Sequence, residues 1–236
     1  MKFLIQTIDG EIKHEFSWHL IKALEFHAWQ SRNIDYIVAE FENIEFFKRN
    51  NIVPIGSVEF VSEFLRLHYG KVPKPKNVPN ELFDYAGRKI WRGYRKNITQ
   101  SKEQPLFIKS NTKLKADSNG VNDGYEALLI EEDEYQISEI VDFNSEWRAF
   151  VFKNELVGLQ NYLEDFTLFP DIKTIHDMIE SYKKNAPVAY TLDVGIMKDK
   201  TVVVEVHDFF SVGLYGFSNY KILPFMFSQW FYEFIK

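Results

Sequence analysis

In the N-terminal third of the chain, short apolar runs alternate with segments whose apolar side chains recur every fourth position. A short apolar run between turn residues predicts a strand, whereas recurrence every three or four positions predicts a helix with one buried face. Phe16, Leu20 and Leu24 recur in this way and predict a helix over residues 15–31. The other predictions are strands at 3–8, 35–41 and 52–55, a short helix from Asn43 to Asn50, and a helix after Ser57. This alternation favours a small α/β unit with parallel strands.

A stretch rich in proline and lysine ends this unit. Pro73, Pro75 and Pro79 lie among three lysines. Proline lacks a backbone N–H and fixes its φ angle, so this stretch cannot form the interior of a helix or a central strand. We therefore predict an N-terminal α/β domain that includes this linker, residues 1–79, and a second domain, residues 80–236.

The second domain is predicted to contain an antiparallel sheet. Its strand-like segments are short and are separated by turn residues at short intervals, which is typical of antiparallel pairing. These segments cover residues 106–108, 127–130, 135–141, 146–152, 156–162, 189–197 and 201–206. Helices are predicted at 81–91, 171–184 and 224–235. The chain as a whole is therefore predicted to combine an α/β unit with an α+β unit.

The composition is that of a globular protein and narrows the possible functions. Of the 236 residues, 45% are hydrophobic, 26% are charged and none is cysteine. The lack of cysteine excludes disulfides, iron–sulfur clusters, cysteine zinc sites and a thiol nucleophile. A net charge of -6 disfavours nucleic acid as a partner. We expect no membrane span and a cytoplasmic location, because no apolar run reaches about 18 residues and the N-terminus soon turns polar.

The strongest candidate for chemistry is a group of acids in the last predicted hairpin. Asp193 lies on its first strand, and Glu205, His207 and Asp208 lie on its second. Glu205 and His207 point to the same side because strand side chains alternate, and antiparallel pairing can bring Asp193 beside them. Carboxylates on apolar strands need a positive partner, and their oxygen atoms favour magnesium. The alternative is an ordinary hairpin whose polar ends face solvent or pair with lysines.

Three cations upstream of this hairpin form a second candidate feature. Lys109 ends a predicted strand, Lys115 follows in a polar loop, and Arg148 lies within a strand. A strand arginine between apolar residues needs an anion or a carboxylate. Fixed cations opposite a metal-binding acid cluster are what a polyphosphate requires. The alternative is that the two lysines are ordinary surface residues, which would be the better interpretation without the acid hairpin. The strand that ends near Asp142 offers backbone groups to an adenine, as any edge strand does.

The order of these features along the chain resembles their order in the ATP-grasp superfamily. A strand that ends in a lysine is followed by a polar loop with a second lysine, a hinge strand and a strand that contains an arginine. An aspartate and then a strand with a glutamate complete the order. The segments Ser145–Val151 and Val204–Phe217 are similar to the clade of that superfamily named for one arginine and two lysines, which is found in bacteria and phages. The resemblance covers residues 80–236. It implies an ATP-grasp fold preceded by a small α/β pre-grasp domain, which fits residues 1–72.

The resemblance also implies roles for individual residues. Lys109 and Lys115 would hold the phosphates of ATP, and Arg88 would be the arginine of the clade's name. Arg148 would face the γ-phosphate and the acyl-phosphate intermediate, so Arg148 and Lys115 are the implied catalytic residues. The implied nucleotide contacts are completed by Glu139, Ile140 and Val141 at the adenine and by Asp142 or Glu139 at the ribose.

The metal ligands follow from the same resemblance. Asp193 and Glu205 match the metal-binding acids of the superfamily, which usually has asparagine where this chain has His207. Imidazole suits magnesium poorly and manganese or zinc better. Either His207 is a third ligand with an altered metal preference, or Asp208 takes its place.

The implied activity is that of an ATP-dependent carboxylate–amine ligase, which forms an acyl phosphate, releases ADP and joins the acyl group to an amine. The implied cofactors are ATP and Mg2+ or Mn2+, and the substrates are small-molecule or peptide carboxylates and amines, with an amino acid, peptide or protein as acceptor. The alternatives are a kinase on the same fold and a non-catalytic nucleotide-binding or interaction protein, to which the departure at His207 points. The aromatic segment 225–234 is predicted to be core or the face of a homodimer.

Overall fold

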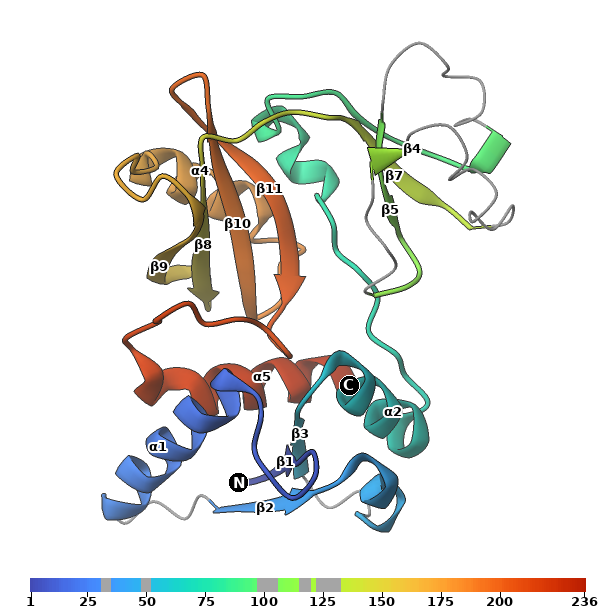
Figure 1. Cartoon of the computed structure of the whole chain (residues 1–236), viewed down its shortest axis with the longest axis vertical. Helices are drawn as coiled ribbons and strands as arrows, with labels where there is room; N and C mark the ends of the chain where they lie inside the picture. Colours follow the sequence, from blue (N-terminus) through green and yellow to red (C-terminus); the bar gives the residue numbers. More distant parts are fainter. Residues whose placement is uncertain (31–34, 48–51, 97–105, 115–119, 122–132) are drawn as a thin grey trace.

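A computed structural model describes residues 1–30, 35–47, 52–96, 106–114, 120–121 and 133–236 (Figure 1). The elements form two lobes along the long axis of the molecule (Figure 1). The N-terminal lobe holds a small parallel sheet, and the larger lobe holds two antiparallel sheets. Among the described residues, no helix combines the length and the apolar character needed to cross a membrane.

The N-terminal lobe is built on a three-stranded sheet in the order β2-β1-β3, and both pairings are parallel, as predicted. The Ser57 hydroxyl caps the helix after this sheet by accepting a hydrogen bond from the Phe60 N–H at 3.2 Å, and Gly70 ends that helix with a φ of 66°. The elements are β1 (Lys2–Gln6), α1 (Glu15–Trp29), β2 (Asp35–Ala39), the 3-10 helix η1 (Phe41–Phe46), β3 (Ile52–Ile55) and α2 (Val58–Tyr69). The short helix predicted from Asn43 is therefore a 3-10 helix that begins two residues earlier.

The larger lobe consists of two four-stranded antiparallel sheets, which confirms the antiparallel prediction. The first, in the order β11-β10-β8-β9, contains β8 (Ser145–Phe152), β9 (Glu155–Glu164), β10 (Ala189–Met197) and β11 (Lys200–Asp208). The second, in the order β4-β7-β5-β6, contains β4 (Ile90–Gly93), β5 (Leu106–Ser110), β6 (Gly120–Val121) and β7 (Tyr135–Glu139). Helix α4 (Ile172–Tyr182) buries Ile175, Met178 and Ile179 in the core of the first sheet. The strand predicted at 127–130 lies outside the described residues.

The helix predicted over residues 81–91 is wrong. The structure has a 3-10 helix, η2 (Asn80–Tyr85), followed by a bend and by strand β4, which pairs with β7. Gly87 in this bend has a φ of +62°, and a Cβ there would lie 2.7 Å from side-chain atoms of both Met197 and Val202. A left-handed residue pressed against a neighbouring strand ends the helix, and pairing within the sheet overrides the local helical pattern.

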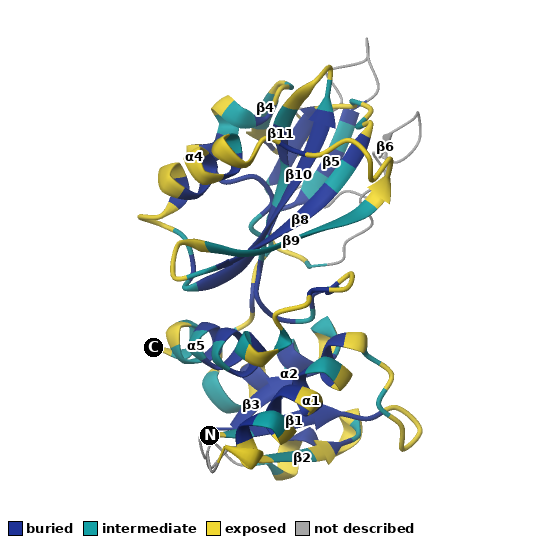
Figure 2. Ribbon diagram, turned by 90° about the vertical axis from the view of Figure 1, so that its left-hand side faces the viewer, coloured by how far each residue is buried: buried dark blue, intermediate teal, exposed yellow. Residues whose placement is uncertain are grey.

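The C-terminal helix α5 (Leu223–Ile235) lies between the two lobes (Figure 1). Its side chains Phe227, Trp230 and Phe231 are buried in the same hydrophobic cluster as Phe3 and Leu20 of the N-terminal lobe. Figure 2 shows buried positions of α5 beside the buried strand β3. Helix α5 also contacts β10 of the larger lobe. One apolar core therefore joins the end of the chain to its beginning and sets how the two lobes meet.

Truncation of Phe231 tests this packing. Phe231 has 0% exposure, and its ring lies edge-on to that of Tyr69 at 5.6 Å. Because the substitution removes buried apolar atoms and leaves a cavity, Phe231→Ala should lower the free energy of unfolding by about 3–5 kcal/mol, measured by urea denaturation. The control is Phe166→Ala, at a position that is 73% exposed, which should change that free energy by less than about 0.5 kcal/mol. Equal losses in the two variants would contradict the structural role of α5.

Candidate functional site

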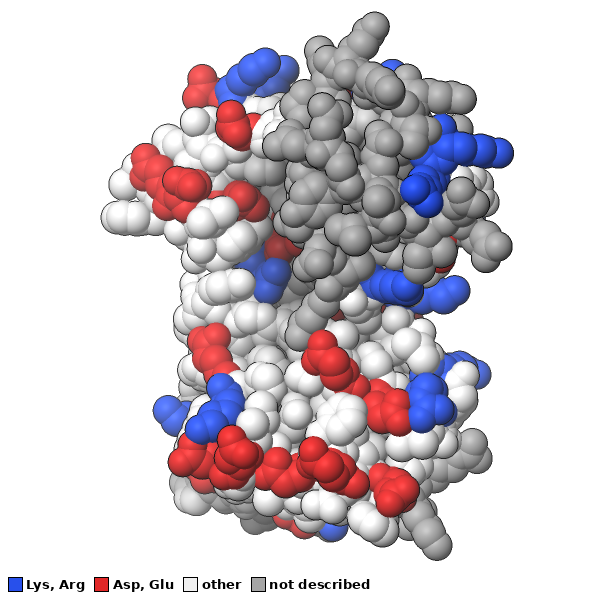
Figure 3. Space-filling view, turned by 45° about the vertical axis from the view of Figure 1, so that its right-hand side comes forward, with Lys and Arg blue, Asp and Glu red and all other residues white. Residues whose placement is uncertain are grey.

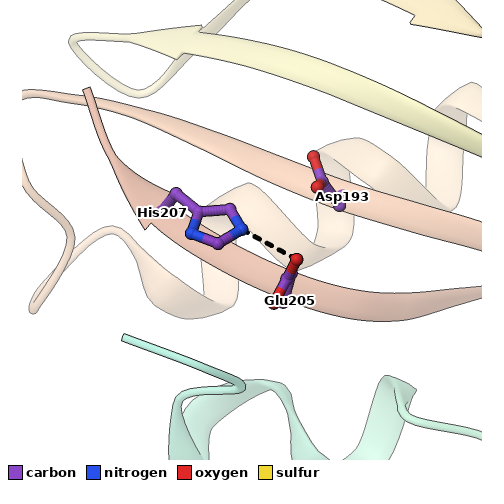
Figure 4. Close-up of side chains that lie close together, drawn as sticks. All are labelled: Asp193, Glu205 and His207. Carbon is purple, nitrogen blue, oxygen red and sulfur yellow. Dashed lines mark ion pairs between the residues drawn. The ribbon is translucent and has the colours of Figure 1, made fainter. Parts of the chain in front are cut away.

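Three charged side chains lie side by side across three adjacent strands of the first antiparallel sheet. Arg148 on β8 is the register partner of Asp193 on β10, which is in turn the partner of Glu205 on β11. Directly opposed residues in an antiparallel sheet project from the same face, so the three side chains gather there. His207 follows two residues after Glu205 and shares its face. The ligand atoms of Asp193, Glu205 and His207 lie within 4.8 Å of one another (Figure 4).

A bidentate ion pair joins Arg148 to Asp193. The Nε and Nη2 atoms of Arg148 donate to Oδ1 and Oδ2 of Asp193 at 2.8 and 2.7 Å. The Nη1 atom donates to the Gly213 carbonyl at 3.2 Å. Burial would lower the pKa of Arg148, but the Asp193 carboxylate outweighs burial and raises that pKa. Arg148 therefore stays charged inside the fold.

Glu205 is the centre of a second set of ion pairs. The Lys109 ammonium contacts Oε2 of Glu205, and the His207 Nε2 atom lies 2.8 Å from Oε1 (Figure 4). Burial alone would raise the pKa of Glu205, but His207 and Lys109 outweigh it and hold that pKa below its ordinary value. Lys109 comes from β5, so this contact links the two antiparallel sheets of the larger lobe.

A cavity of about 460 Å³ opens beside this contact, between the two sheets. Its walls combine charged, amide and aromatic side chains, and its lining consists of Arg88, Phe107, Lys109, Gln136, Ser138, Glu139, Ile140, Val141, Phe143, Glu146, Tyr162, Val204 and Glu205. The predicted adenine-binding residues, 139–141, thus line the same cavity as Lys109 and Glu205. The Glu139 carboxylate accepts a hydrogen bond from the Lys89 N–H at 2.9 Å. Asp142 is exposed and lies outside the lining, and Lys115 lies outside the described residues.

Arg88 brings a further positive charge to the cavity wall. Its guanidinium donates to the carbonyls of Val203 at 2.8 Å and Val204 at 3.1 Å, and it lies over the Phe143 ring at 5.6 Å from the centroid. Burial lowers the pKa of Arg88, and the nearby carboxylates of Glu205 and Glu146 act in the opposite direction. Its hydrogen bonds go to neutral carbonyls, so its charge remains available to an anion in the cavity.

Glu146 and Tyr162, which the sequence analysis did not single out, lie at the site together with Tyr215. The Tyr162 hydroxyl donates to Glu146 at 2.6 Å, and the Arg148 guanidinium lies over the rings of Tyr162 and Tyr215 at 5.6 and 5.2 Å. The two tyrosine rings stack on each other at 5.2 Å. Burial raises the pKa of Glu146. Glu146 precedes Arg148 by two positions on one strand, so strand periodicity alone could have identified it.

The donor atoms present fit a divalent metal ion. Asp193 and Glu205 supply carboxylate oxygens and His207 supplies a nitrogen, a set that suits manganese and, through its oxygens, magnesium. Asp208 stands apart from this group: it is buried, its Oδ1 lies 3.7 Å from the Lys76 Nζ, and burial raises its pKa. The described geometry therefore favours His207 over Asp208 as a third ligand.

Comparisons with known proteins identify the family and the fold of the chain. A family model described as ATP-grasp domain, R2K clade family 2, matches residues 85–224. A search of curated protein sequences found no match. The fold is similar to that of a RimK domain ATP-grasp protein from Sphaerobacter thermophilus, with a TM-score of 0.60 and 14% identity over 100% of this chain and 99% of that one.

Two further solved structures share the fold. D-alanine–D-alanine ligase from Bacillus anthracis, complexed with ATP, has a TM-score of 0.54 and 12% identity over 99% of this chain and 97% of the other. D-cycloserine synthetase has a TM-score of 0.58 and 12% identity over 100% of both chains. The family model spans more than half of the chain, and the fold is similar to that of the ATP-grasp protein above over 100% of this chain. The chain belongs to family 2 of the R2K clade of ATP-grasp domains.

Proposed function

We propose that the protein is an ATP-dependent carboxylate–amine ligase that works through an acyl phosphate and releases ADP. The observation that carries the proposal is the cluster of opposite charges at the cavity, in which Arg148 pairs with Asp193 and Lys109 pairs with Glu205. The family supports ATP as a substrate. The structural neighbours include enzymes named as a D-alanine–D-alanine ligase and a D-cycloserine synthetase, which supports ligation as the reaction class.

The charge cluster is self-neutralised without nucleotide and can exchange partners when nucleotide binds. A buried charge that loses its partner is strongly destabilising, so each group must gain a new partner as it gives up the old one. Lys109, Arg88 and Lys115 would take the phosphates, and Asp193, Glu205 and His207 would hold a magnesium or manganese ion. That ion supplies positive charge that screens the phosphates when it is bound. No group in the cluster is then left unpaired.

The rest of the cavity suits the nucleoside. Residues 139–141 line the cavity, and their backbone would form hydrogen bonds with the edge of the adenine base. Phe107 and Phe143 offer apolar surface to the adenine ring. The Glu139 carboxylate is tied to the Lys89 N–H, so ribose binding by Glu139 requires that contact to open. The exposed carboxylate of Asp142 is the other proposed ribose contact.

Arg148 would stabilise the phosphoryl group during its transfer. A substrate carboxylate oxygen forms a bond to the γ-phosphorus, the bond to the β–γ bridging oxygen breaks, and ADP leaves. An amine then attacks the acyl carbon, and inorganic phosphate leaves. The fork of Arg148 is held in place by Gly213 and by the rings of Tyr162 and Tyr215, so it is oriented before the reaction begins. Lys115 is the proposed second catalytic cation.

Nucleotide binding gives the first test. Ligand at 100 times its Kd stabilises the folded state by about 2.7 kcal/mol, and each kcal/mol shifts Tm by about 2–4 °C in a chain of this size. Saturating ADP or ATP with Mg2+ or Mn2+ should therefore raise Tm by about 5–10 °C in differential scanning fluorimetry. AMP, which lacks the outer phosphates, should raise Tm much less. A flat response to all three nucleotides would refute the assignment of the cavity.

Substitution of Glu205 tests the metal assignment. Glu205→Gln keeps the size of the side chain but removes its charge, so it should lower the rate of ADP release at least about 100-fold while the circular dichroism spectrum is retained. Arg148→Lys should be nearly as damaging because lysine lacks the bidentate fork. Glu155→Gln, at an exposed position where β9 begins, is the matched control and should keep full activity. Full turnover in the Glu205→Gln variant would refute the assignment of Glu205 as a metal ligand.

The metal preference is expected to depend on His207. Because imidazole favours manganese more than magnesium, His207→Asn should raise the rate with Mg2+ relative to the rate with Mn2+ several-fold. The measurement is the ratio of ADP release rates at saturating concentrations of each metal. An unchanged ratio would mean that His207 does not contact the ion.

A further inference from the structure

A second cavity, of about 290 Å³, lies on the other side of the charge cluster. Arg148 and His207 line this second cavity, whereas Lys109 and Glu205 line the first. The cluster is therefore the wall between two cavities. Under the proposed function, a nucleotide in the first cavity presents its outer phosphate at this wall, so the second cavity is the space for the carboxylate substrate.

Two lysines of the proline-rich linker, Lys74 and Lys76, also line the second cavity. The linker is held firmly against the larger lobe. The Val206 N–H donates to the Asn77 carbonyl at 2.7 Å, and the Asn77 side chain donates to the Ser110 carbonyl at 3.0 Å. Linker residue Val78 exchanges two hydrogen bonds with the Gln136 side chain, at 2.9 and 2.8 Å. The two lysines are thus attached to a fixed backbone. Figure 3 shows Lys and Arg side chains at the level where the two lobes meet.

The second cavity has more positive than negative charge. Lys74 makes no hydrogen bond or ion pair with any described residue. The Lys76 Nζ lies 3.7 Å from Oδ1 of the buried Asp208, which is longer than a hydrogen bond. Asp208 is the one carboxylate among the described lining residues, against Lys74, Lys76 and Arg148. The unmatched charge among the described lining residues is that of Lys74, which the linker contributes.

Size limits what the second cavity can hold. A volume of about 290 Å³ is at the lower end of the range for ligand sites, which runs from about 300 to 1,000 Å³. It suits a molecule of the size of one amino acid, with its carbon chain against apolar residues such as Phe210 and Val212. Cations from two different elements line this cavity: Arg148 comes from β8, and the two lysines come from the linker.

We propose that the second cavity binds a small dicarboxylic acid, with one carboxylate at Arg148 and the other at Lys74 and Lys76. The inference rests on the proposed function, because it is the carboxylate next to Arg148 that would accept the phosphoryl group. The second carboxylate does not react and serves for recognition. A lysine is the specificity-determining group here, since an amide in place of that carboxylate leaves the charge of Lys74 unmatched.

Hydroxylamine trapping tests this proposal without knowledge of the natural amine. Hydroxylamine attacks the acyl phosphate, releases phosphate and leaves a hydroxamate that is measured by its iron complex. With ATP and Mg2+ or Mn2+, L-glutamate, L-aspartate and succinate are compared with their monoamides L-glutamine, L-asparagine and succinamate. At least one diacid should have a kcat/KM about tenfold or more above that of its monoamide, as expected for a hydrogen bond to a charged group.

Variants of Lys74 provide the decisive comparison. Lys74→Gln should lower kcat/KM for the diacid about tenfold through KM and leave that of the monoamide unchanged. Lys74→Arg should restore the preference, because it restores the charge. Lys200→Gln, at an exposed position on β11 outside both cavities, should behave as the unchanged protein. An equal loss for diacid and monoamide in the Lys74→Gln variant would overturn the proposal.

Calorimetry with a non-hydrolysable ATP analogue separates failure of this inference from failure of the proposed function. Succinate should bind the complex at least about tenfold more tightly than succinamate. If the analogue binds and the monoamides bind or react as well as the diacids, or if no diacid binds, the dicarboxylate proposal is wrong and the ligase proposal stands. If neither the analogue nor ATP binds, the proposed function itself fails.

Discussion

The site depends on the requirement that buried charges have partners. Arg148 and Asp193 are 8% and 1% exposed, and their bidentate contact is what allows both to lie within an apolar sheet. Removal of one partner from such a pair costs about 3–5 kcal/mol because the other charge remains buried. The same requirement explains why Glu205 holds both Lys109 and His207. Under the proposed function, a site that is balanced in this way takes up nucleotide and metal ion together, so that each buried charge keeps a partner.

The fold places this balanced cluster where two sheets and two cavities meet. Antiparallel register aligns Arg148, Asp193 and Glu205 across the first sheet, and Lys109 reaches them from the second. Helix α5 and the linker position the N-terminal lobe below the cluster (Figure 1). The proline-rich stretch also contributes Lys74 and Lys76 to the lining of the second cavity.

Strand periodicity predicted that the three candidate metal ligands lie together, because they are close in sequence or directly opposed in a hairpin. Asp193, Glu205 and His207 follow from the period of two and a short turn. The contribution of Lys109 depends on the approach of a second sheet, which no local pattern encodes, and its assignment came from the family resemblance. Tyr215, with a left-handed φ of 49°, sits in an irregular loop, where no strand or helix period places its side chain. The bend at Gly87 misled the helix prediction because its cause is a contact with a strand far along the chain.

A crystal structure with manganese and a non-hydrolysable ATP analogue would test the central claim most directly. Anomalous scattering at the manganese edge should place the ion in contact with the Asp193 and Glu205 carboxylates, with the triphosphate within hydrogen-bond reach of Lys109. The Lys109–Glu205 ion pair should then be replaced by contacts to phosphate and metal. Nucleotide bound elsewhere, with both ion pairs of the cluster intact, would contradict the account.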